Sequence, residues 1–287
     1  MFDVIIIGGG PAGISASLYT KRGNKKTLVI NSESSTLQEV HKIENYYGFE
    51  NGISGKELYD IGIKQAKNLG IEVKQEEVLS VKINEKGFEV ITNKDTYESE
   101  TVIIAVGNKK NKVKIKGIKD FEGKGVSYCA ICDGFFYRDK EVAVIGSGNY
   151  AISETNDLIN IAKKVTILTN GEKAPEFRAD NVEINSKPIE EIEGKDKVEK
   201  VIFNDRSSIN ADGIFVAQGT AGGFELAKKL GLLIKDNHII VNENMETNIK
   251  GVYACGDCTG GLMQVSKSVY QGTVAGLEVI KFLNKNK

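Results

Sequence analysis

The stretch DVIIIGGGPAGISA, residues 3–16, recurs in altered form as EVAVIGSGNYAISE, residues 141–154, and this repeat decides the fold. The two stretches align without gaps, and each has a short β-branched run, a glycine-rich turn and then a segment typical of a helix. A β-branched run of this kind suits a strand buried in a parallel sheet. A further such run follows each copy, KKTLVIN at 25–31 and KKVTILT at 163–169, so each copy predicts a β-α-β unit.

The glycines of the repeat have the spacing of a phosphate-binding turn. The first two permit a tight turn and the approach of a pyrophosphate, and the third small residue lets the helix pack close to the strand. These positions are Gly8, Gly10 and Gly13 in the first copy, and Gly146, Gly148 and Ala151 in the second. The start of the following helix presents unpaired N–H groups to phosphates. The first copy predicts a nucleotide site, whereas the second is either another site or a turn kept for packing.

Later strand patterns complete two units. They are KGFEVITN at 86–93, ETVIIAVGN at 100–108, GIFVAQGT at 213–220 and the start of GVYACGDCTGG at 251–261. After the last strand come Gly256-Asp257, whose acid can hold a ribitol or sugar hydroxyl, and a helix from about Met263 to Leu283. We predict an α/β fold of two Rossmann-like, three-layer nucleotide-binding domains, the second inserted into the first. The first comprises residues 1–112 and 243–287, and the second comprises residues 113–242.

Composition excludes several classes of function. The 287 residues carry a net charge of -1, so no overall field favours nucleic acid or an anionic membrane. The longest apolar runs, such as Val4 to Ile7, are too short to span a membrane, and no secretion signal opens the chain. We therefore expect a cytoplasmic protein with mostly reduced thiols. Four cysteines in two Cys-x-x-Cys pairs then indicate catalysis or metal binding.

The first cysteine pair lies in SYCAICDGFF, residues 127–136, where Asp133 directly follows Cys132. Two sulfurs at this spacing can bind a metal, or they can form and reopen a disulfide. Exchange with another disulfide needs one thiolate to attack and a second thiol within reach to resolve the product. An adjacent acid such as Asp133 can carry the proton that a dithiol gains or loses.

Over nearly its whole length, the sequence resembles the low-molecular-weight thioredoxin reductases. The matching stretches are VIIIGGGPAGISAS, IENYYGFENGISGKEL, TVIIAVGN, FEGKGVSYCAICDGFFYRDKEVAVIGSGN and GVYACGDCTGGLMQVSKSVYQG. The resemblance implies FAD in the first domain, a redox disulfide between Cys129 and Cys132 in the second, thioredoxin as acceptor, and a homodimer. It also implies that Cys132 lies against the flavin and that Cys129 attacks thioredoxin.

The predicted cofactor contacts come from this resemblance and from the turns described above. Asn31 stands at the end of the second strand, where an acid commonly bonds the ribose. The full set of predicted FAD contacts is Gly8, Gly10, Pro11, Ala12, Gly13, Asn31, Asn45, Gly107, Gly256, Asp257, Gln264 and Val265.

No metal site is predicted. The two cysteine pairs lie more than a hundred residues apart, whereas the pairs of zinc ribbons are usually about 15–20 residues apart. Cys255 and Cys258 flank the turn at Gly256-Asp257, and we interpret them as small packing residues in the flavin loop. A redox role for this second pair stays an open alternative.

The second copy of the repeat departs from the family pattern. Members that use NADPH carry a His-Arg-Arg run and a further arginine after the corresponding strand. Here Thr169, Asn170, Gly171 and Glu172 occupy those positions. The bidentate bonds of arginine to a 2′-phosphate are missing, and Glu172 would repel that phosphate. In this respect the chain resembles the ferredoxin-dependent flavin thioredoxin reductases, which predicts reduced ferredoxin as the electron donor.

A lysine-rich stretch also bears on the donor. KKNKVKIKGIK, residues 109–119, has six lysines and no acid. From Lys110 to Lys116 the lysines alternate, so a strand here would have one basic face that could steer an acidic ferredoxin, or merely guard a sheet edge.

Two other functions stay open. One is a thioredoxin reductase dependent on NADPH or NADH, in which Glu172 would bond an adenine ribose. The other is a non-enzymatic flavin redox sensor, against which the intact set of Cys129, Cys132 and Asp133 argues.

Overall fold

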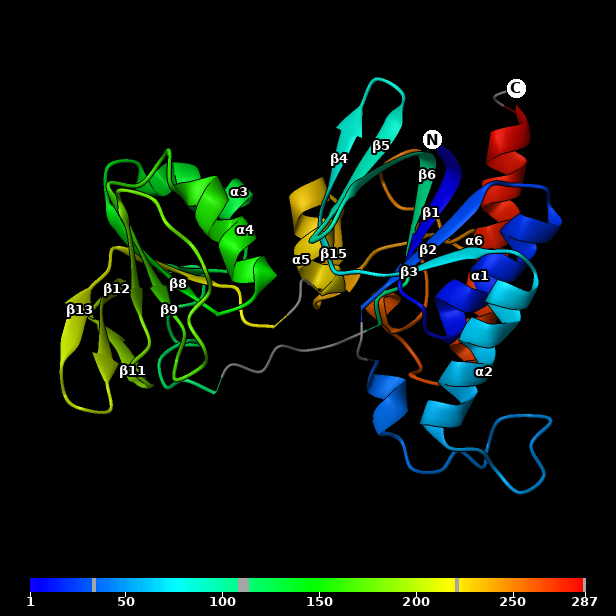
Figure 1. Ribbon diagram of the computed structural model, residues 1–287, viewed down its shortest axis with the longest axis horizontal. Coiled ribbons are helices and arrows are strands. Elements are labelled where there is room, and N and C mark those ends of the chain that lie inside the picture. The colour runs from blue at the N-terminus through cyan, green and yellow to red at the C-terminus, as the bar shows by residue number, and fades with distance from the viewer. Residues whose placement is uncertain (33–34, 108–113, 220–221, 286–287) are drawn as a thin grey trace. The chain divides into compact units, whose positions relative to one another are not determined.

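The computed structural model describes residues 1–32, 35–107, 114–219 and 222–285 (Figure 1). The chain forms two compact units: unit 1 comprises Met1–Lys109 and Gly222–Lys287, and unit 2 comprises Lys110–Ala221. Each unit is built on a sheet that contains parallel strands, and one copy of the glycine repeat supplies a strand to each: β1 in unit 1 and β8 in unit 2. The predicted α/β fold, with one Rossmann-like unit inserted into another, is confirmed.

Unit 1 contains a mixed sheet in the order β3-β2-β1-β6-β5-β4, with β17 beside β6. The strands are β1 (Phe2–Ile7), β2 (Thr27–Asn31), β3 (Glu72–Gln75), β4 (Val78–Asn84), β5 (Gly87–Thr92), β6 (Thr96–Ile104) and β17 (Val252–Ala254). The pairings of β1 with β2 and β6 are parallel, as are those of β3 with β2 and of β17 with β6, whereas β4 and β5 form an antiparallel hairpin. The carboxyl ends of β1, β2, β6 and β17 therefore meet at one edge, where the predicted cofactor residues begin.

The helices of unit 1 cover this sheet (Figure 1). They are α1 (Pro11–Arg22), α2 (Gly55–Asn68), α5 (Gly223–Leu230) and α6 (Val265–Lys285), with short 3-10 turns η1 (Thr36–Glu39) and η3 (Asp257–Thr259) and a hairpin of β15 (Ile234–Lys235) and β16 (His238–Ile239). Helix α1 packs against α6, α2 and the sheet, so small residues such as Ala16 and Ala275 become fully buried. None of the described helices is long and apolar enough to cross a membrane.

Unit 2 contains a parallel sheet in the order β10-β9-β8-β14-β7 and a separate antiparallel sheet of three strands. The parallel strands are β7 (Val126–Ser127), β8 (Glu141–Ile145), β9 (Lys164–Leu168), β10 (Val182–Asn185) and β14 (Gly213–Val216). The antiparallel strands are β11 (Ile189–Gly194), β12 (Val198–Phe203) and β13 (Ser208–Asn210), and the helical segments are α3 (Ala130–Asp133), η2 (Gly134–Tyr137) and α4 (Asn149–Leu158). Buried apolar residues such as Ile145, Val201 and Ile214 join both sheets in one core.

The return to unit 1 lies earlier than the sequence prediction placed it. The prediction assigned residues 113–242 to the inserted domain, whereas residues 222–242 group with unit 1. In this segment α5 packs against β4, and Lys229 Nζ donates to the carbonyl oxygen of Leu79 at 3.4 Å. The amide of Leu233 also bonds Asn248 Oδ1 at 2.8 Å. These contacts attach the segment to unit 1 before the predicted boundary.

Where the lysine-rich stretch is described, it does not form the strand that would give it one basic face. Lys110 and Lys112 lie outside the described residues, and residues 114–119 form a single bridge at Lys116 followed by a turn. The physical reason is that Ile115 and Ile118, three residues apart, are both buried in the core of unit 2. That spacing suits a turn and does not suit the alternation of a strand.

Candidate active site

The first glycine loop joins β1 to α1. Gly8 and Gly13 of this loop are crowded by backbone atoms, whereas Gly10 has no described neighbour. An added Cβ at Gly8, where φ is +115°, would lie 2.3 Å from the carbonyl oxygen of Ala105. One at Gly13 would lie 1.9 Å from the carbonyl oxygen of Gly8. At Gly10 an added Cβ would meet nothing within 4 Å among the described residues. Gly8 and Gly13 thus permit the turn and the close helix, while Gly10 faces open space.

Helix α1 begins at this loop without a side-chain cap. Its N-cap is Gly10, and no described side chain bonds the first turn. Pro11 occupies the first helical position, where its fixed φ suits the helix and its missing N–H removes no intrahelical bond. The amides that follow, from Ala12 onward, are oriented to bind an anion.

The second predicted cofactor loop lies against the first. An added Cβ at Gly256, where φ is +82°, would lie 2.9 Å from the Cβ of Ala12. Next to it, Asp257 Oδ1 accepts a hydrogen bond from Ser268 Oγ at 3.4 Å. Gln264 Oε1 accepts from Asn45 Nδ2 at 3.0 Å, which joins residues far apart in the sequence. The structure therefore brings together residues that were predicted separately, immediately before α6 starts at Val265.

Asn31 ends β2 and Gly107 follows β6, and these two strands lie on either side of β1 in the same sheet. Asn31 Nδ2 lies 2.5 Å from the hydroxyl of Tyr59, while Asn31 Oδ1 is buried without a hydrogen-bond partner in the described structure. A buried acceptor without a partner is costly, and a ligand hydroxyl would satisfy it. Gly107, at φ +73°, has nothing described within 4 Å of an added Cβ. These features fit a dinucleotide bound along the edge formed by β1, β2 and β6.

Cys255 and Cys258 are buried thiols behind this loop. Cys258 Sγ lies 3.2 Å from the carbonyl oxygen of Cys255. Burial raises the pKa of Cys255 well above its usual value, and burial raises the pKa of Cys258 to about 12. Thiols that stay protonated are poor nucleophiles. The arrangement therefore favours a packing role over a redox role for this pair.

The cysteines of the first pair are joined by a disulfide in unit 2, with an S–S distance of 2.06 Å. Cys129 is the N-cap of α3, and its sulfur accepts from the amide of Cys132 at 3.2 Å. Cys129 is 0% exposed, whereas Cys132 on the outer side of the short helix is exposed. Direct attack by Cys129 on a partner would therefore require this turn to open after reduction.

Ser127 connects Asp133 to the disulfide turn, a role that the sequence analysis did not anticipate. Its Oγ donates to Asp133 Oδ2 at 2.6 Å and accepts from the amide of Cys129 at 3.1 Å. Asp133 is thereby held at the base of the turn rather than in free solution. The only signal in the sequence was a hydroxyl residue two positions before Cys129.

Glu154 also supports this turn from α4. Its side chain is 1% exposed, and its Oε2 accepts from the amide of Ala130, the first residue of α3, at 2.6 Å. A charge-assisted bond to a helix N-terminus is among the stronger hydrogen bonds in proteins. The buried position of Glu154 could have been inferred from the α4 pattern, but its partner could not.

The second glycine loop keeps its turn but lies beside an acid. Gly146 has φ +155°, and an added Cβ would lie 2.2 Å from the carbonyl oxygen of Ala217. Glu172, after β9, accepts a hydrogen bond from Ser147 Oγ of this loop. Lys173 and Arg178 are exposed. No group of metal-binding side chains occurs among the described residues.

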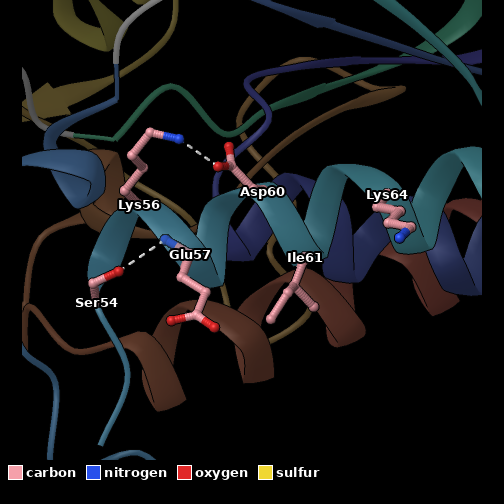
Figure 2. A pocket seen from close by; sticks show the side chains of 6 residues that line it. All are labelled: Ser54, Lys56, Glu57, Asp60, Ile61 and Lys64. Carbon is pink, nitrogen blue, oxygen red and sulfur yellow. Dashed lines mark hydrogen bonds and ion pairs between the residues drawn. The ribbon is translucent and has the colours of Figure 1, made fainter.

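A surface hollow of about 280 Å³ runs along α2 (Figure 2). Its lining residues are Ser54, Lys56, Glu57, Asp60, Ile61 and Lys64. Lys56 Nζ pairs with Asp60 Oδ2 at 2.6 Å, and Ser54 Oγ caps the helix by accepting from the amide of Glu57 at 3.1 Å. None of these is a predicted site residue, so the hollow is not part of the candidate active site.

Comparisons with known proteins bear on the whole chain. The profile of the pyridine nucleotide-disulphide oxidoreductases matches residues 2–272. The chain is 36% identical to a thioredoxin reductase of Rickettsia prowazekii, with 98% of each chain covered.

Two solved structures are similar over their full length. The atypical thioredoxin reductase of Desulfovibrio vulgaris Hildenborough is 33% identical, with a TM-score of 0.91 and 99% of each chain covered. A ferredoxin-flavin thioredoxin reductase of Clostridium acetobutylicum is 36% identical, with a TM-score of 0.74 and coverage of 99% of this chain and 98% of the other.

The chain belongs to the pyridine nucleotide-disulphide oxidoreductases. Like the thioredoxin reductases of this family, it is a flavoprotein disulfide reductase with FAD as its cofactor. The residues of unit 1 fit that cofactor: Gly10 leaves room beside an uncapped helix start, and Asn31 Oδ1 is a buried acceptor without a described partner. Within the oxidoreductase, the Cys129–Cys132 disulfide is the described group suited to exchange with a substrate disulfide.

Proposed function

We propose that this protein reduces thioredoxin with electrons from reduced ferredoxin, through FAD and the Cys129–Cys132 pair. The observation that carries the choice of donor is the second glycine loop. The positions that would bind a 2′-phosphate are Thr169, Asn170, Gly171 and Glu172, and the carboxylate of Glu172 is bonded to Ser147 of the loop itself. A phosphate dianion needs cations there, and a carboxylate repels it.

The acceptor is supported by the relatives that are named thioredoxin reductases. The exchange balances as follows. Two electrons and two protons convert the Cys129–Cys132 disulfide to two thiols. One thiolate attacks the disulfide of thioredoxin, which forms a mixed disulfide and releases a thiol on thioredoxin. The second thiol of the pair then attacks the mixed disulfide, re-forms the Cys129–Cys132 bond and leaves thioredoxin with two thiols.

The residues around the pair serve this exchange. We assign the attack to Cys129 and the flavin-facing position to Cys132, as the family resemblance implies. We assign proton transfer to Asp133, which is adjacent to Cys132 in the chain and whose carboxylate Ser127 holds at the turn. Glu154 anchors the start of α3 through the amide of Ala130.

FAD, when bound, supplies a centre that accepts single electrons and delivers a pair to a disulfide. The residues that would hold it surround the first glycine loop and the loop before α6, and they are Gly8, Gly10, Pro11, Ala12, Gly13, Asn31, Asn45, Gly107, Gly256, Asp257, Gln264 and Val265.

Ferredoxin as donor gains support from the similar protein of Clostridium acetobutylicum that is described as a ferredoxin-flavin thioredoxin reductase. Ferredoxins are typically acidic, and exposed lysines such as Lys114 and Lys119 would attract one. Lys116 is less available, because it pairs with Glu191. We further propose a cytoplasmic homodimer, which light scattering on the purified protein would test.

The alternative is a reductase that uses NADPH or NADH, with Glu172 bonded to the adenine ribose. Steady-state assays distinguish the two functions. Thioredoxin thiols are measured with reduced ferredoxin, NADPH or NADH as sole donor. The proposal expects turnover with ferredoxin alone, and sustained turnover with either nucleotide would overturn it. If no donor supports turnover although dithionite does, the acceptor assignment stands and the ferredoxin assignment fails.

A further inference from the structure

Three segments of unit 2 converge beside the second glycine loop. Ser147 follows β8, Glu172 follows β9, and Gln218 follows β14. These strands are neighbours and run parallel in the order β9-β8-β14. The three side chains therefore lie at the carboxyl edge of the sheet, where nucleotides bind in folds of this type.

The carboxylate of Glu172 is bonded on both of its oxygens. Ser147 Oγ donates to Oε2, and Gln218 Nε2 donates to Oε1 at 3.3 Å. One bond comes from the middle residue of the Gly-Ser-Gly loop itself. A negative charge is thus held against the loop by two donors from the protein.

The turn that carries Glu172 is anchored on several sides. The amide of Glu172 donates to the carbonyl oxygen of Thr169 at 3.0 Å, and Thr169 Oγ1 donates to the carbonyl oxygen of Glu172 at 2.7 Å. Asn170 and Gly171 both have positive φ, +51° and +85°, and Gly171 N donates to the carbonyl oxygen of Ser186 at 3.1 Å. The position of Glu172 is therefore set by the backbone.

In the first glycine loop, the described residue nearest the middle position is a neutral amide. The middle residue is Gly9, and an added Cβ there would lie 2.9 Å from the Cβ of Asn31. Asn31 is neutral, and its Oδ1 has no partner in the described structure. The loop that fits FAD thus offers a vacant acceptor, whereas in the second loop the neighbouring residue is a bonded carboxylate.

Among the described residues, few atoms lie close to Gly148 of the second loop. An added Cβ at Gly148 would find only the carbonyl oxygen of Gly219, at 3.8 Å, among the described atoms. Helix α4 starts there at Asn149 without a side-chain cap from any described residue. Its backbone could still accept a phosphate. The described part of this loop therefore keeps a shape that leaves space for a phosphate.

We propose that Glu172 is an internal anion of the second glycine loop and that its charge excludes pyridine nucleotides from an otherwise competent turn. The carboxylate of Glu172 accepts the hydrogen bond that the Ser147 hydroxyl could otherwise donate to a ligand. Its negative charge repels phosphates that would approach the start of α4. This inference rests on the proposed function, in which the electron donor is not a nucleotide. It assigns the exclusion of nucleotides to the side chain of Glu172.

The test measures binding of ADP-ribose and of 2′-phospho-ADP-ribose to the FAD-containing protein by calorimetry. Glu172→Gln removes the charge and keeps the shape. Glu176→Gln, also at an exposed position after β9, is the matched control. Removing one like charge from the site should tighten both ligands about tenfold or more in Glu172→Gln, and leave Glu176→Gln like the wild type.

Equal affinity in wild type and Glu172→Gln would overturn the inference. Weaker ADP-ribose binding in Glu172→Gln would also overturn it, because Glu172 would then be a ribose ligand. Thioredoxin reduction with dithionite as donor should be unchanged in both variants, which verifies the fold. Reduction of the wild-type flavin by NADPH would overturn both the proposed function and the inference, because a nucleotide would then not be excluded, whereas equal affinity of wild type and Glu172→Gln would overturn the inference alone.

Discussion

Cys129 and Cys132 form one disulfide, but their surroundings differ. Cys129 is fully buried beneath α3, whereas Cys132 is exposed. The family resemblance assigns the attack on thioredoxin to Cys129, while exposure in the oxidised state favours Cys132. The two assignments can be separated because only the resolving cysteine can be removed without losing the mixed disulfide.

The Cys132→Ser variant should trap a covalent complex with thioredoxin. Cys129 would attack, and no second thiol would remain to resolve the mixed disulfide. The complex is measured by non-reducing electrophoresis after incubation with thioredoxin whose attacked cysteine is disulfide-bonded to a labelled thiol. That thiol is released when the mixed disulfide forms. Cys129→Ser is the matched control and should give no stable complex. A stable complex from Cys129→Ser alone would reverse the roles and would agree with the exposure seen in the oxidised protein.

Asp133→Asn should slow thioredoxin turnover by about a hundredfold, because proton transfer by a positioned acid has an effect of this size. The disulfide should still form, since the amide keeps a hydrogen-bond acceptor for Ser127. Ser127→Ala is the matched variant, and it should cause a smaller loss because it displaces the carboxylate without removing it. Turnover and free thiols are measured across pH, and full activity of Asp133→Asn would remove this residue from the mechanism.

At this scale the sequence identified residues by type but not by contact. Cys129, Cys132 and Asp133 stand out because they are adjacent in the chain. Ser127 and Glu154 do not, because their bonds to Asp133 and Ala130 depend on how β7, α3 and α4 pack. The bond between Asn45 and Gln264 likewise joins predicted residues through a contact that no local pattern contains.

At the level of elements, the glycines of the first loop have separable roles. Gly8→Ala should destabilise the fold by about 3 kcal/mol, because its Cβ would meet the carbonyl oxygen of Ala105 at a positive φ. Gly10→Ala, with φ -76° and no described neighbour, should fold normally yet bind FAD about tenfold more weakly or worse.

Circular dichroism and the FAD-to-protein ratio distinguish these outcomes. Gly8→Ala should lose both native signal and flavin, whereas Gly10→Ala should lose flavin only. Retention of flavin by Gly10→Ala at the wild-type ratio would mean that the cofactor does not approach the loop there.

The junction of β5 and β6 should make stability depend on pH in the alkaline range. The hydroxyl of Tyr97 donates to Glu76 Oε1 at 2.8 Å, and Thr92 Oγ1 donates to Oε2 at 2.7 Å. Burial, followed by the bond to Glu76, raises the pKa of Tyr97 to about 12. A tyrosine pKa raised above its unfolded value of about 10 stabilises the fold below that pH and loses the effect as pH rises through the folded pKa.

The wild type should therefore exceed Tyr97→Phe in unfolding free energy below about pH 10, and the difference should vanish by about pH 12. Urea titrations of both proteins over this range measure the difference. Subtracting the unfolding free energy of Tyr97→Phe from that of the wild type at each pH removes the contribution of the other tyrosines. A gap that stays constant up to about pH 12 would show that the Tyr97 hydroxyl is not held by Glu76.

Long, strongly patterned elements were predictable because their burial follows their own sequence. The strands at 2–7, 27–31 and 164–168 are β-branched runs, and α6 follows the predicted acid turn. The basic face that a strand from Lys110 to Lys116 would have is not formed by the described residues from Lys114 onward, because Ile115 and Ile118 enter the core of unit 2 at turn spacing. Two-residue strands such as β7 and β15 have too few residues to show any period.

For the whole molecule, the repeated glycine motif predicted two nucleotide-type units and the insertion of one into the other. The motif could not predict the residue at which the chain re-enters unit 1, because α5 belongs to that unit through its packing on β4 and carries no motif of its own. The same limit applies to the donor. The turn at Gly146 keeps the shape of a nucleotide loop, and the arguments against that use are the missing arginines and the charge of Glu172 beside it.

The identity of the electron donor is tested most directly by anaerobic titration of the oxidised protein with NADPH, NADH and reduced ferredoxin. Flavin absorbance and thioredoxin thiols are followed together in each titration. We expect reduced ferredoxin to bleach the flavin and generate thioredoxin thiols, while both nucleotides leave the absorbance unchanged. Rapid, saturable bleaching by micromolar NADPH, with matching formation of thioredoxin thiols, would contradict the account.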